Sequence, residues 1–395
     1  MKRIYLDHAA TTQLDKRVFE KMSPYFLEVY GNANSQHGYG RDAQKAVDLA
    51  RDLIAKLIGS KPNEVYFTSG GTESDNWALR GTVKALKDKG NHVIISKIEH
   101  AAMLTTAKEL EKEGIEVSYI GVDEEGFINL DELKKAIRPT TVLISCMLAN
   151  NEIGTIEPIK EIVKIAKEHG ILVHTDAVQA MGAMDVNVLD LGVDMLSFSA
   201  HKFNGPKGIG ALYIKNGIPM ARLISGGHQE RTRRGGTTNV PGIVGFAEAL
   251  KLTKENLEKD VAYVSSLRDR FIQRVLEEIP YVKLNGAKDM SKRLPSNADF
   301  SFEFIEGESI LFSLDMDGIA VSSGSACSSG SLEPSHVLLA IGLSEEIAHG
   351  TIRFSFGKEN TTEEVDFVVD TLKNTIQRLR EMSPLFSLKG ETKNV

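Results

Sequence analysis

The length, composition and charge of the chain set the first limits on what it can be. It has 395 residues, of which 42% are hydrophobic and 26% charged, and its formal net charge is −7. This composition is typical of a globular protein, and the length predicts two domains. A net negative charge argues against bulk binding to nucleic acid, which favours a basic surface. We therefore expect no nucleic-acid partner.

Cysteine usage and hydropathy indicate the cellular compartment. The two cysteines, Cys146 and Cys327, are too few for a disulfide framework, which suits a reducing cytoplasm. Near the N-terminus, Asp7 and His8 interrupt the first apolar run before a signal-peptide core could form. No stretch reaches the roughly 18 continuous apolar residues of a membrane span. These features predict a cytoplasmic protein with no membrane partner.

Short apolar runs alternate with helical patterns as far as Pro241. An amphipathic pattern predicts a helix over residues 41–58, and helical patterns also cover Ala101–Glu113 and Ile159–His169. Near-continuous apolar strands between helices are typical of a mainly parallel, doubly wound sheet, so the predicted fold class is α/β. Seven runs are expected to be strands: Glu64–Thr68, His92–Ser96, Glu116–Ile120, Val142–Leu148, Ile171–Thr175, Met195–Ser199 and Gly210–Ile214.

The pattern changes after Pro241, where a smaller α+β domain is expected at the C-terminal end. A long helical stretch continues to about Glu278, and a closing helix covers about Thr362–Arg380. Three strands are expected here: Phe300–Phe304, Ile319–Ser322 and Thr351–Phe356.

These patterns predict where the two domains divide. We place a large domain at residues 15–257. The small domain takes residues 1–14 and 258–384 and carries the loop around Cys327. The polar tail, residues 385–395, is expected to be disordered.

A lysine and an aspartate stand at the ends of two apolar runs. Lys202 follows the strand Met195–Ser199, and Asp176 follows the strand Ile171–Thr175. A lysine amine can bond to the aldehyde of pyridoxal 5′-phosphate (PLP), and a carboxylate can hold a proton on its ring nitrogen. The pair therefore predicts a PLP site. For Asp176 alone, the alternative is that it caps the helix that follows.

The segment Ser69–Asp75 is a candidate phosphate site. It follows a predicted strand and opens a helical pattern, and glycines such as Gly71 let backbone N–H groups approach a phosphate at a helix N-terminus. The alternative is a capped helix, in which Thr72 is the N-cap and Asp75 lies three residues on.

Other polar side chains follow strand ends. Ser199 and His201 stand beside the lysine and offer further phosphate donors. Gln179 lies three residues after Asp176, so that it could reach a ring oxygen. His100 follows the strand His92–Ser96, where doubly wound sheets place ligand contacts, and could stack on the ring and relay protons. A structural role for this histidine is an equal alternative.

The two cysteines stand in opposite surroundings. Cys146 lies in an apolar strand, as a buried structural cysteine does. Cys327 lies in Ser322–Ser331, which consists mainly of serine and glycine and is expected to be an exposed, mobile loop. A thiol on such a loop could enter a site, attack and withdraw. The alternative is an incidental surface cysteine.

Arg353 is a candidate for binding a carboxylate. It lies in the strand pattern Thr351–Phe356, where Ile352 and Phe354 point to one side and Arg353 to the other. An arginine fork can bind a carboxylate through two parallel hydrogen bonds. The alternative is an arginine on the outer surface of the strand.

Together these residues resemble the cysteine desulfurases, of the class V aminotransferase group within the fold type I PLP enzymes. The resemblance runs nearly end to end. The motifs that carry it are Tyr5–Thr12, Gly31–Ser35, Thr68–Asn76, Asn150–Gly154, Thr175–Gln179, His201–Gly208, Arg231–Thr237, Gly324–Ser328, Leu332–His336 and Ile352–Phe356.

The resemblance implies roles for the matching residues. Lys202, His100 and Cys327 would be catalytic, with Lys202 bonded to the cofactor and Cys327 carrying a persulfide. Thr237 would reach the phosphate in a neighbouring subunit, so that a homodimer is needed for a complete site. The cofactor-binding set would be Gly71, Thr72, His100, Asn151, Asp176, Gln179, Ser199, His201, Lys202 and Thr237. The residues that bind the substrate carboxylate would be Asn32, Asn151 and Arg353.

The activity that this family implies is desulfuration of L-cysteine to L-alanine. Lys202 would remove the Cα proton, and the Cys327 thiolate would then attack the substrate sulfur. The form of the Gly324–Cys327 motif is similar to the subgroup that serves iron–sulfur cluster assembly. Cys327 would then be a transient iron–sulfur ligand shared with a scaffold partner. The tail after Pro384 departs from the C-terminus expected of scaffold-docking members, so the sulfur acceptor stays open.

Other functions compatible with the same residues use the thiol differently. A selenocysteine lyase or cysteine-sulfinate desulfinase would stay active without Cys327, because its leaving group departs more easily. An ordinary aminotransferase would need a 2-oxo acid and would have no use for the thiol. A non-catalytic sulfur-handling scaffold with a vestigial PLP pocket would not need Lys202 and Asp176.

Overall fold

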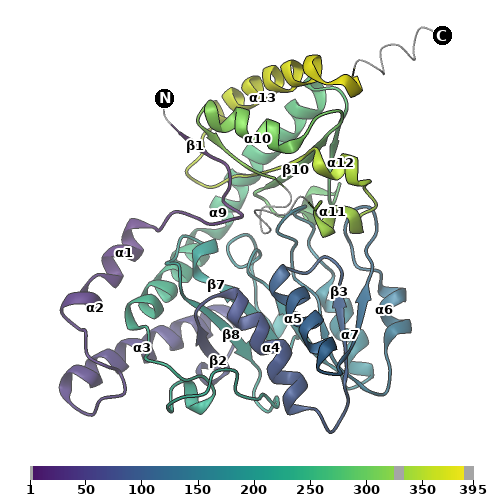
Figure 1. Cartoon of the computed structure of the whole chain (residues 1–395). Helices are drawn as coiled ribbons and strands as arrows, with labels where there is room; N and C mark the ends of the chain where they lie inside the picture. Colours follow the sequence, from purple (N-terminus) through teal and green to yellow (C-terminus); the bar gives the residue numbers. More distant parts are fainter. Residues whose placement is uncertain (1–2, 324–332, 387–395) are drawn as a thin grey trace.

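A large sheet at the base of the molecule and a smaller sheet above it organise the fold (Figure 1). The computed structural model describes residues 3–323 and 333–386, so Cys327 and most of the predicted disordered tail lie outside the described residues. Within these two ranges, no helix combines the length and the apolar character needed to cross a membrane.

The large sheet has the strand order β2-β8-β7-β6-β5-β3-β4. All the strands run in one direction except β8, which is antiparallel to both its neighbours. The predicted mainly parallel, doubly wound sheet is therefore confirmed, although β5 ends three residues before the predicted Leu148. The bounds are Val65–Thr68 (β2), His92–Ser96 (β3), Glu116–Ile120 (β4), Thr141–Ser145 (β5), Leu172–Asp176 (β6), Met195–Ser199 (β7) and Gly210–Ile214 (β8).

One face of this sheet is covered by two helices that follow strands β2 and β3. They are α4 (Gly71–Ala85) and α5 (Ala101–Lys112). Trp77 of α4 packs in one cluster with Met195 and Leu212, which belong to β7 and β8. Successive residues of a strand point to opposite faces of the sheet. The residues that alternate with these therefore point to the other face.

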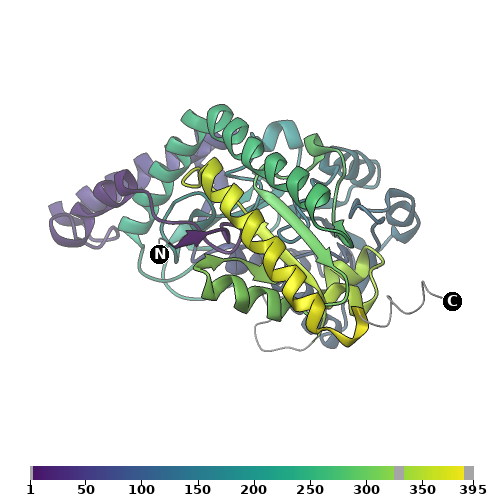
Figure 2. The ribbon, with the colours of Figure 1, turned by 90° about the horizontal axis from the view of Figure 1, so that it is seen from above.

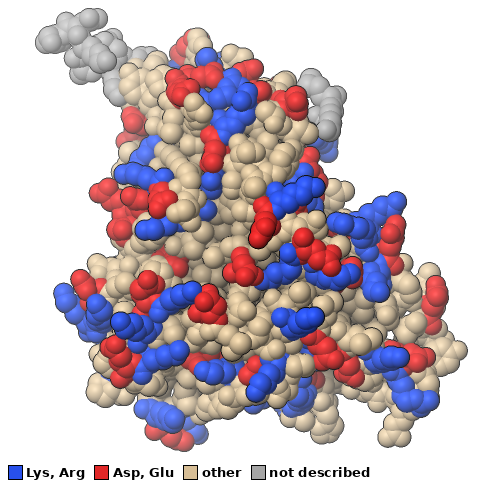
Figure 3. Space-filling model, turned by 180° about the vertical axis from the view of Figure 1, so that it is seen from behind, with Lys and Arg blue, Asp and Glu red and all other residues tan. Residues whose placement is uncertain are grey.

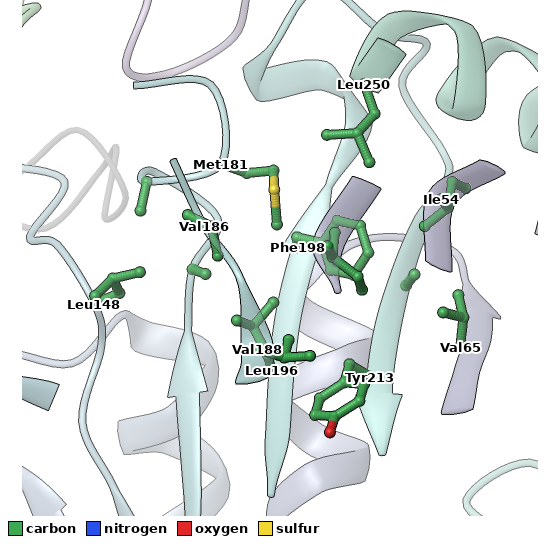
Figure 4. Packing of buried hydrophobic residues seen from close by; sticks show 14 of the residues in the cluster. Ile54, Val65, Leu148, Met181, Val186, Val188, Leu196, Phe198, Tyr213 and Leu250 are labelled. Carbon is green, nitrogen blue, oxygen red and sulfur yellow. The ribbon is translucent and has the colours of Figure 1, made fainter. Parts of the chain in front are cut away.

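The opposite face is covered by α3 (Gly38–Ile58), α7 (Ile159–Glu168) and the first part of α9 (Val240–Glu278). Figure 4 shows this core, in which Phe198 of β7 lies near Leu250 of α9. The helix α3 ends at Gly59, whose φ of 74° is a left-handed conformation that glycine adopts without strain. Helices on both faces bury most of the strands, whereas the edge strand β4 stays partly exposed.

The smaller sheet has the order β12-β13-β10-β9 and is antiparallel. The second half of α9 packs with α10 and α13 against it, and α13 crosses the top of the molecule in Figure 2. Its strands are β9 (Val282–Leu284), β10 (Asn297–Phe302), β12 (Ser322–Ser323) and β13 (Thr351–Ser355). The remaining helices are α1 (Lys16–Met22), α2 (Pro24–Leu27), α6 (Leu130–Ala136), α8 (Val188–Leu191), α10 (Gly307–Met316), α11 (His336–Ala340), α12 (Glu345–His349) and α13 (Thr362–Met382).

One predicted strand of the small domain is wrong. The segment Ile319–Ser322 is two short strands that belong to different sheets, because the chain changes partner at Val321. β11 (Ile319–Ala320) pairs in parallel with β1 (Ile4–Tyr5), whereas β12 pairs with β13. The β1–β11 pair brings the N-terminal segment into the upper part of the molecule (Figure 1).

The division into domains at residue 258 stays a prediction. This position lies inside α9, which is continuous from Val240 to Glu278. The lower core takes its buried α9 residues up to Leu250, and the upper core takes them from Val264 onward.

Candidate active site

A cavity of about 280 Å³ opens where the strands of the large sheet end. Loops after the carboxyl ends of β2, β3, β5, β6 and β7 supply most of its wall, as is usual for ligand sites in doubly wound sheets. The structure brings together all the predicted site residues except Asn32 and Thr237, which are exposed and do not line the cavity, and Cys327, which lies outside the described residues. The wall consists of Ala9, Ala10, Gly71, Thr72, Asp75, His100, Met147, Asn151, Asp176, Val178, Gln179, Ser199, His201, Lys202 and Arg353.

Lys202 reaches into the cavity from the turn after β7. Its Nζ donates to the carbonyl oxygens of Ala9 at 2.5 Å and Ala10 at 2.9 Å. Gln179 Nε2 also donates to Ala9 O, at 2.9 Å. The backbone of the N-terminal segment therefore orients the lysine and the glutamine.

Asp176 ends β6 and is buried, with its carboxylate at the cavity wall. Its Oδ1 accepts the Val178 N–H at 2.8 Å. Asp176 therefore makes a local capping hydrogen bond and also lines the cavity. Turns rather than an α-helix follow it. Burial raises the pKa of Asp176, while His100, the Val178 N–H and Lys202 lower it.

The helix α4 points its N-terminus at the cavity. It begins at Gly71, with Gly70 as the N-cap and no side-chain cap, so the first N–H groups keep no side-chain acceptor. The alternative in which Thr72 is the N-cap is wrong, because the extended Gly70 starts the helix two residues earlier. A Cβ on Gly71 would lie 2.8 Å from Val178 Cγ2, so this close approach requires glycine.

Ser199 and His201 add polar groups beside this helix terminus. Ser199 is buried at the end of β7, and His201 Nδ1 lies 3.2 Å from Thr11 Oγ1. Burial, together with the charges of Lys202 and Lys207, lowers the pKa of His201 to about 4. The ring is therefore neutral near pH 7 and can donate one hydrogen bond to an anion.

His100 has a structural role as a helix cap and also lies in the cavity wall, whereas stacking on the ring and proton relay stay predictions. It lines the cavity, and it is the N-cap of α5, where its Nδ1 accepts the Ala102 N–H at 3.1 Å. A nitrogen that accepts an N–H carries no proton, so this contact leaves Nε2 as the nitrogen that can donate into the cavity.

Arg353 is buried within β13, so the strand-surface alternative is wrong. Its Nη1 donates to Asn151 O at 2.9 Å, and its Nη2 donates to Asp7 Oδ1 at 3.0 Å. The Nε is buried and has no hydrogen-bond partner among the described residues. The guanidinium is thus fixed in the wall with donors left for a carboxylate.

Comparison with known proteins identifies the family of this chain. The model described as Aminotransferase class-V matches residues 4–368. The chain belongs to this family. A protein named cysteine desulfurase IscS from Clostridium botulinum (strain Hall) is 54% identical, over 98% of this chain and 97% of that protein. One of the same name from Methanosarcina thermophila is 51% identical, over 97% and 94%.

Solved structures similar to this class-V chain carry related names. One named NifS-like protein has a TM-score of 0.90 and 39% identity, covering 96% of this chain and 100% of that one. Another, named SspA in complex with cysteine, has a TM-score of 0.79 and 36% identity, covering 91% and 100%. The class-V family implies PLP, and the cavity offers a lysine amine, a buried carboxylate and an uncapped helix terminus for such a group.

Some wall residues of this class-V chain had no role in the sequence analysis. Ala9 and Ala10 contribute only backbone atoms, so no side-chain pattern could mark them, although the motif Tyr5–Thr12 contains them. Asp75 was considered only as a capping residue. Among the described residues, to which Cys327 does not belong, no group of three or more His, Cys, Asp or Glu side chains could hold a metal.

Proposed function

We propose that the chain is a PLP-dependent cysteine desulfurase that converts L-cysteine to L-alanine and receives the sulfur on Cys327 as a persulfide. The observation that carries the proposal is that Lys202, Asp176 and Arg353 share one cavity with the N-terminus of α4. Relatives about half identical over nearly the whole chain, named cysteine desulfurases, support it, as does a structural neighbour named for its complex with cysteine.

The described side chains suit the parts of PLP. Lys202 would bond to the aldehyde, Asp176 would pair with the ring nitrogen, and Gln179 would approach the ring oxygen. The N–H groups of α4, with Ser199 and His201, would hold the phosphate. When bound, PLP supplies an electron sink for negative charge at the substrate Cα.

The remaining chemistry belongs to side chains of this chain. Arg353 and Asn151 hold the substrate carboxylate, and the Lys202 amine takes the Cα proton. The Cys327 thiolate attacks the substrate sulfur, so that an S–S bond forms as the C–S bond breaks. The carbon fragment takes up a proton and leaves as alanine. His100 carries a proton on Nε2 and is placed to serve these transfers.

The proposed assembly is a homodimer that delivers sulfur to an acceptor protein. Thr237 would complete the phosphate site of the neighbouring subunit, and Asn32 would lie near the substrate carboxylate. Iron–sulfur cluster assembly is the proposed destination of the sulfur, with Cys327 as a transient ligand shared with a scaffold. The iron–sulfur role rests on the names of the relatives and on the Gly324–Cys327 motif.

The test is to incubate the purified protein with L-cysteine and a thiol reductant and to measure sulfide and alanine in one sample. Equal amounts of both products are expected. Lys202→Ala should abolish both, whereas Lys207→Ala, at an exposed position five residues on, should keep them. Absence of both products from PLP-loaded protein would contradict the proposal. Transfer of an amino group to a 2-oxo acid would then favour an aminotransferase, and turnover of selenocysteine a lyase.

A further inference from the structure

A second buried carboxyl group lies in the wall of the cavity beside Asp176. Asp75 projects from α4, the helix whose N-terminus faces the same cavity, and is only 1% exposed. Its Oδ1 is buried and makes no hydrogen bond with any described residue. A buried carboxylate oxygen without a hydrogen-bond partner is costly, so the protonation state of Asp75 needs an explanation.

A basic side chain beside Asp75 is the buried His174. Its Nε2 lies 3.7 Å from Asp75 Oδ1, which is too far for a hydrogen bond. His174 is held between two hydroxyl groups, with Nδ1 at 2.8 Å from Ser145 Oγ and Nε2 at 2.9 Å from Ser197 Oγ. Burial lowers the pKa of His174 to about 3, so the imidazole is neutral and forms no ion pair with Asp75.

Different neighbouring groups shift the pKa values of Asp75 and Asp176. Burial and the charges of Asp176 and Glu99 raise the pKa of Asp75 well above its usual value, and a hydrogen bond from Ser197 opposes them only in part. For Asp176, His100, Lys202 and the Val178 N–H favour the ionised form against the effect of burial. Two neighbouring carboxyl groups of this kind hold one charge more easily than two.

We propose that Asp75 is a positioning residue that carries a proton in the resting protein, so that Asp176 holds the single negative charge of the pair. This inference deepens the proposed function, because Asp176 is the carboxylate expected at the ring nitrogen. A neutral Asp75 lets Asp176 stay ionised in a buried site, where a second charge would drive a proton onto it. Next to Asp75 and Asp176 lies a neutral, hydrogen-bonded group of polar side chains: His174, Ser145 and Ser197.

The test compares infrared spectra of the full-length protein at pH 7, with and without PLP, before and after the substitution Asp75→Asn. The amide of asparagine is neutral and nearly the same size as a protonated aspartate. We expect Asp75→Asn to remove one carbonyl band of a protonated carboxylic acid and to leave the carboxylate absorption unchanged. Asp75→Asn should also keep the parent affinity for PLP, whereas Asp75→Ala should weaken it about tenfold through loss of a buried polar neighbour.

A positive control checks that such a band can be detected. Burial raises the pKa of Glu157 to about 8, so this residue is protonated at pH 7, and it does not line the cavity. Its Oε2 accepts the Ile128 N–H at 3.0 Å, a bond that glutamine can keep. Glu157→Gln should therefore also remove one acid band, without changing PLP binding.

Loss of a carboxylate band from Asp75→Asn would overturn the inference, as would equal PLP affinities of Asp75→Asn and Asp75→Ala. If Asp75→Asn does not fold, the spectrum of Asp176→Asn tests the inference instead. Asp176→Asn should lose a carboxylate band, because burial still keeps Asp75 protonated. Loss of an acid band from Asp176→Asn would overturn the inference. The infrared result needs no turnover. Failure of the desulfurase proposal would therefore be seen separately, in the absence of sulfide and alanine.

Discussion

At the scale of single residues, the site is organised before any ligand binds. Arg353 is 3% exposed, and its guanidinium is already held by Asp7 and by the Asn151 carbonyl. A side chain ordered in the free protein loses little conformational freedom on binding, so more of each hydrogen bond contributes to affinity. Lys202 is oriented in the same way by the carbonyl groups of Ala9 and Ala10.

Replacing Arg353 by lysine tests its role in binding the substrate. Arg353→Lys keeps the charge but loses the planar fork, so the KM for L-cysteine should rise about tenfold or more, with a smaller change in kcat. Arg378→Lys, at an exposed position on α13, is the matched control and should leave both constants unchanged. Steady-state kinetics that show a fall in kcat alone would argue against a carboxylate contact.

The sequence predicts those site residues that follow strand ends, such as His100, Asp176 and Lys202. Parallel strands end at one edge of a sheet, so their positions in the sequence are enough to place them together. Asp75 and Ala9 could not be placed in this way. Asp75 enters the cavity along the side of a helix, and Ala9 arrives through the β1–β11 pair, which joins distant parts of the chain.

At the scale of elements, the last strand of the large sheet is closed by side chains rather than by another strand. β2 lies at one end of the strand order, and within the described residues β8 is its one partner strand. The Glu230 carboxylate accepts the Phe67 N–H at 3.0 Å and forms two hydrogen bonds with Arg51, at 2.7 and 2.8 Å. Arg51 Nη1 also donates to Val65 O, so this buried pair occupies backbone groups that would otherwise invite edge pairing.

Breaking this pair should destabilise the fold strongly. The Arg51 and Glu230 side chains are 11% and 8% exposed, so Glu230→Ala leaves a buried, unpaired guanidinium. We expect the free energy of unfolding in urea to fall by about 3–5 kcal/mol. The control is Asp131→Ala, whose pair with Lys134 is mostly exposed and should contribute less than about 1 kcal/mol. Equal effects of the two substitutions would refute the edge role of Glu230.

Elements with several clear repeats of their period could be predicted from the sequence, and the shortest ones could not. The seven strands of the large sheet and α9 lie where their patterns placed them, since each gives several repeats of its period. β1 and β9 have two and three residues and carry no such signal. Their pairing depends on partners remote in the sequence.

At the scale of the whole molecule, charges of both signs are mixed on the surface, and burial favours the neutral form of several interior carboxyl groups. The face in Figure 3 shows Lys and Arg side chains interspersed with Asp and Glu. Several titratable groups are instead buried in neutral form. Burial raises the pKa of Glu157 to about 8 and that of Asp299 to about 7. Folding therefore binds protons that the unfolded chain releases near neutral pH.

This burial predicts how stability depends on pH. The pKa of Glu157 is raised above its ordinary value of 4.5, so its contribution is present at low pH and is lost as the pH rises towards 8. Between pH 5 and pH 7, the free energy of unfolding of the parent relative to Glu157→Gln should fall by about 1.4 kcal/mol per pH unit. Urea unfolding at several pH values measures this difference. Glu161→Gln, at an exposed position, serves as the control. If the free energy of unfolding of the parent changed with pH in parallel with that of Glu157→Gln, Glu157 would not be an acid buried in neutral form.

The central claim is that sulfur passes from L-cysteine to Cys327, and a single turnover without reductant tests it most directly. Alanine is counted, and the sulfur is located by mass spectrometry of the peptides. We predict one alanine per active subunit and one added sulfur on the peptide with Cys327. The peptide with Cys146 should carry none, because burial raises the pKa of that thiol well above its usual value. Alanine formed while the Cys327 peptide stays unmodified would contradict the account.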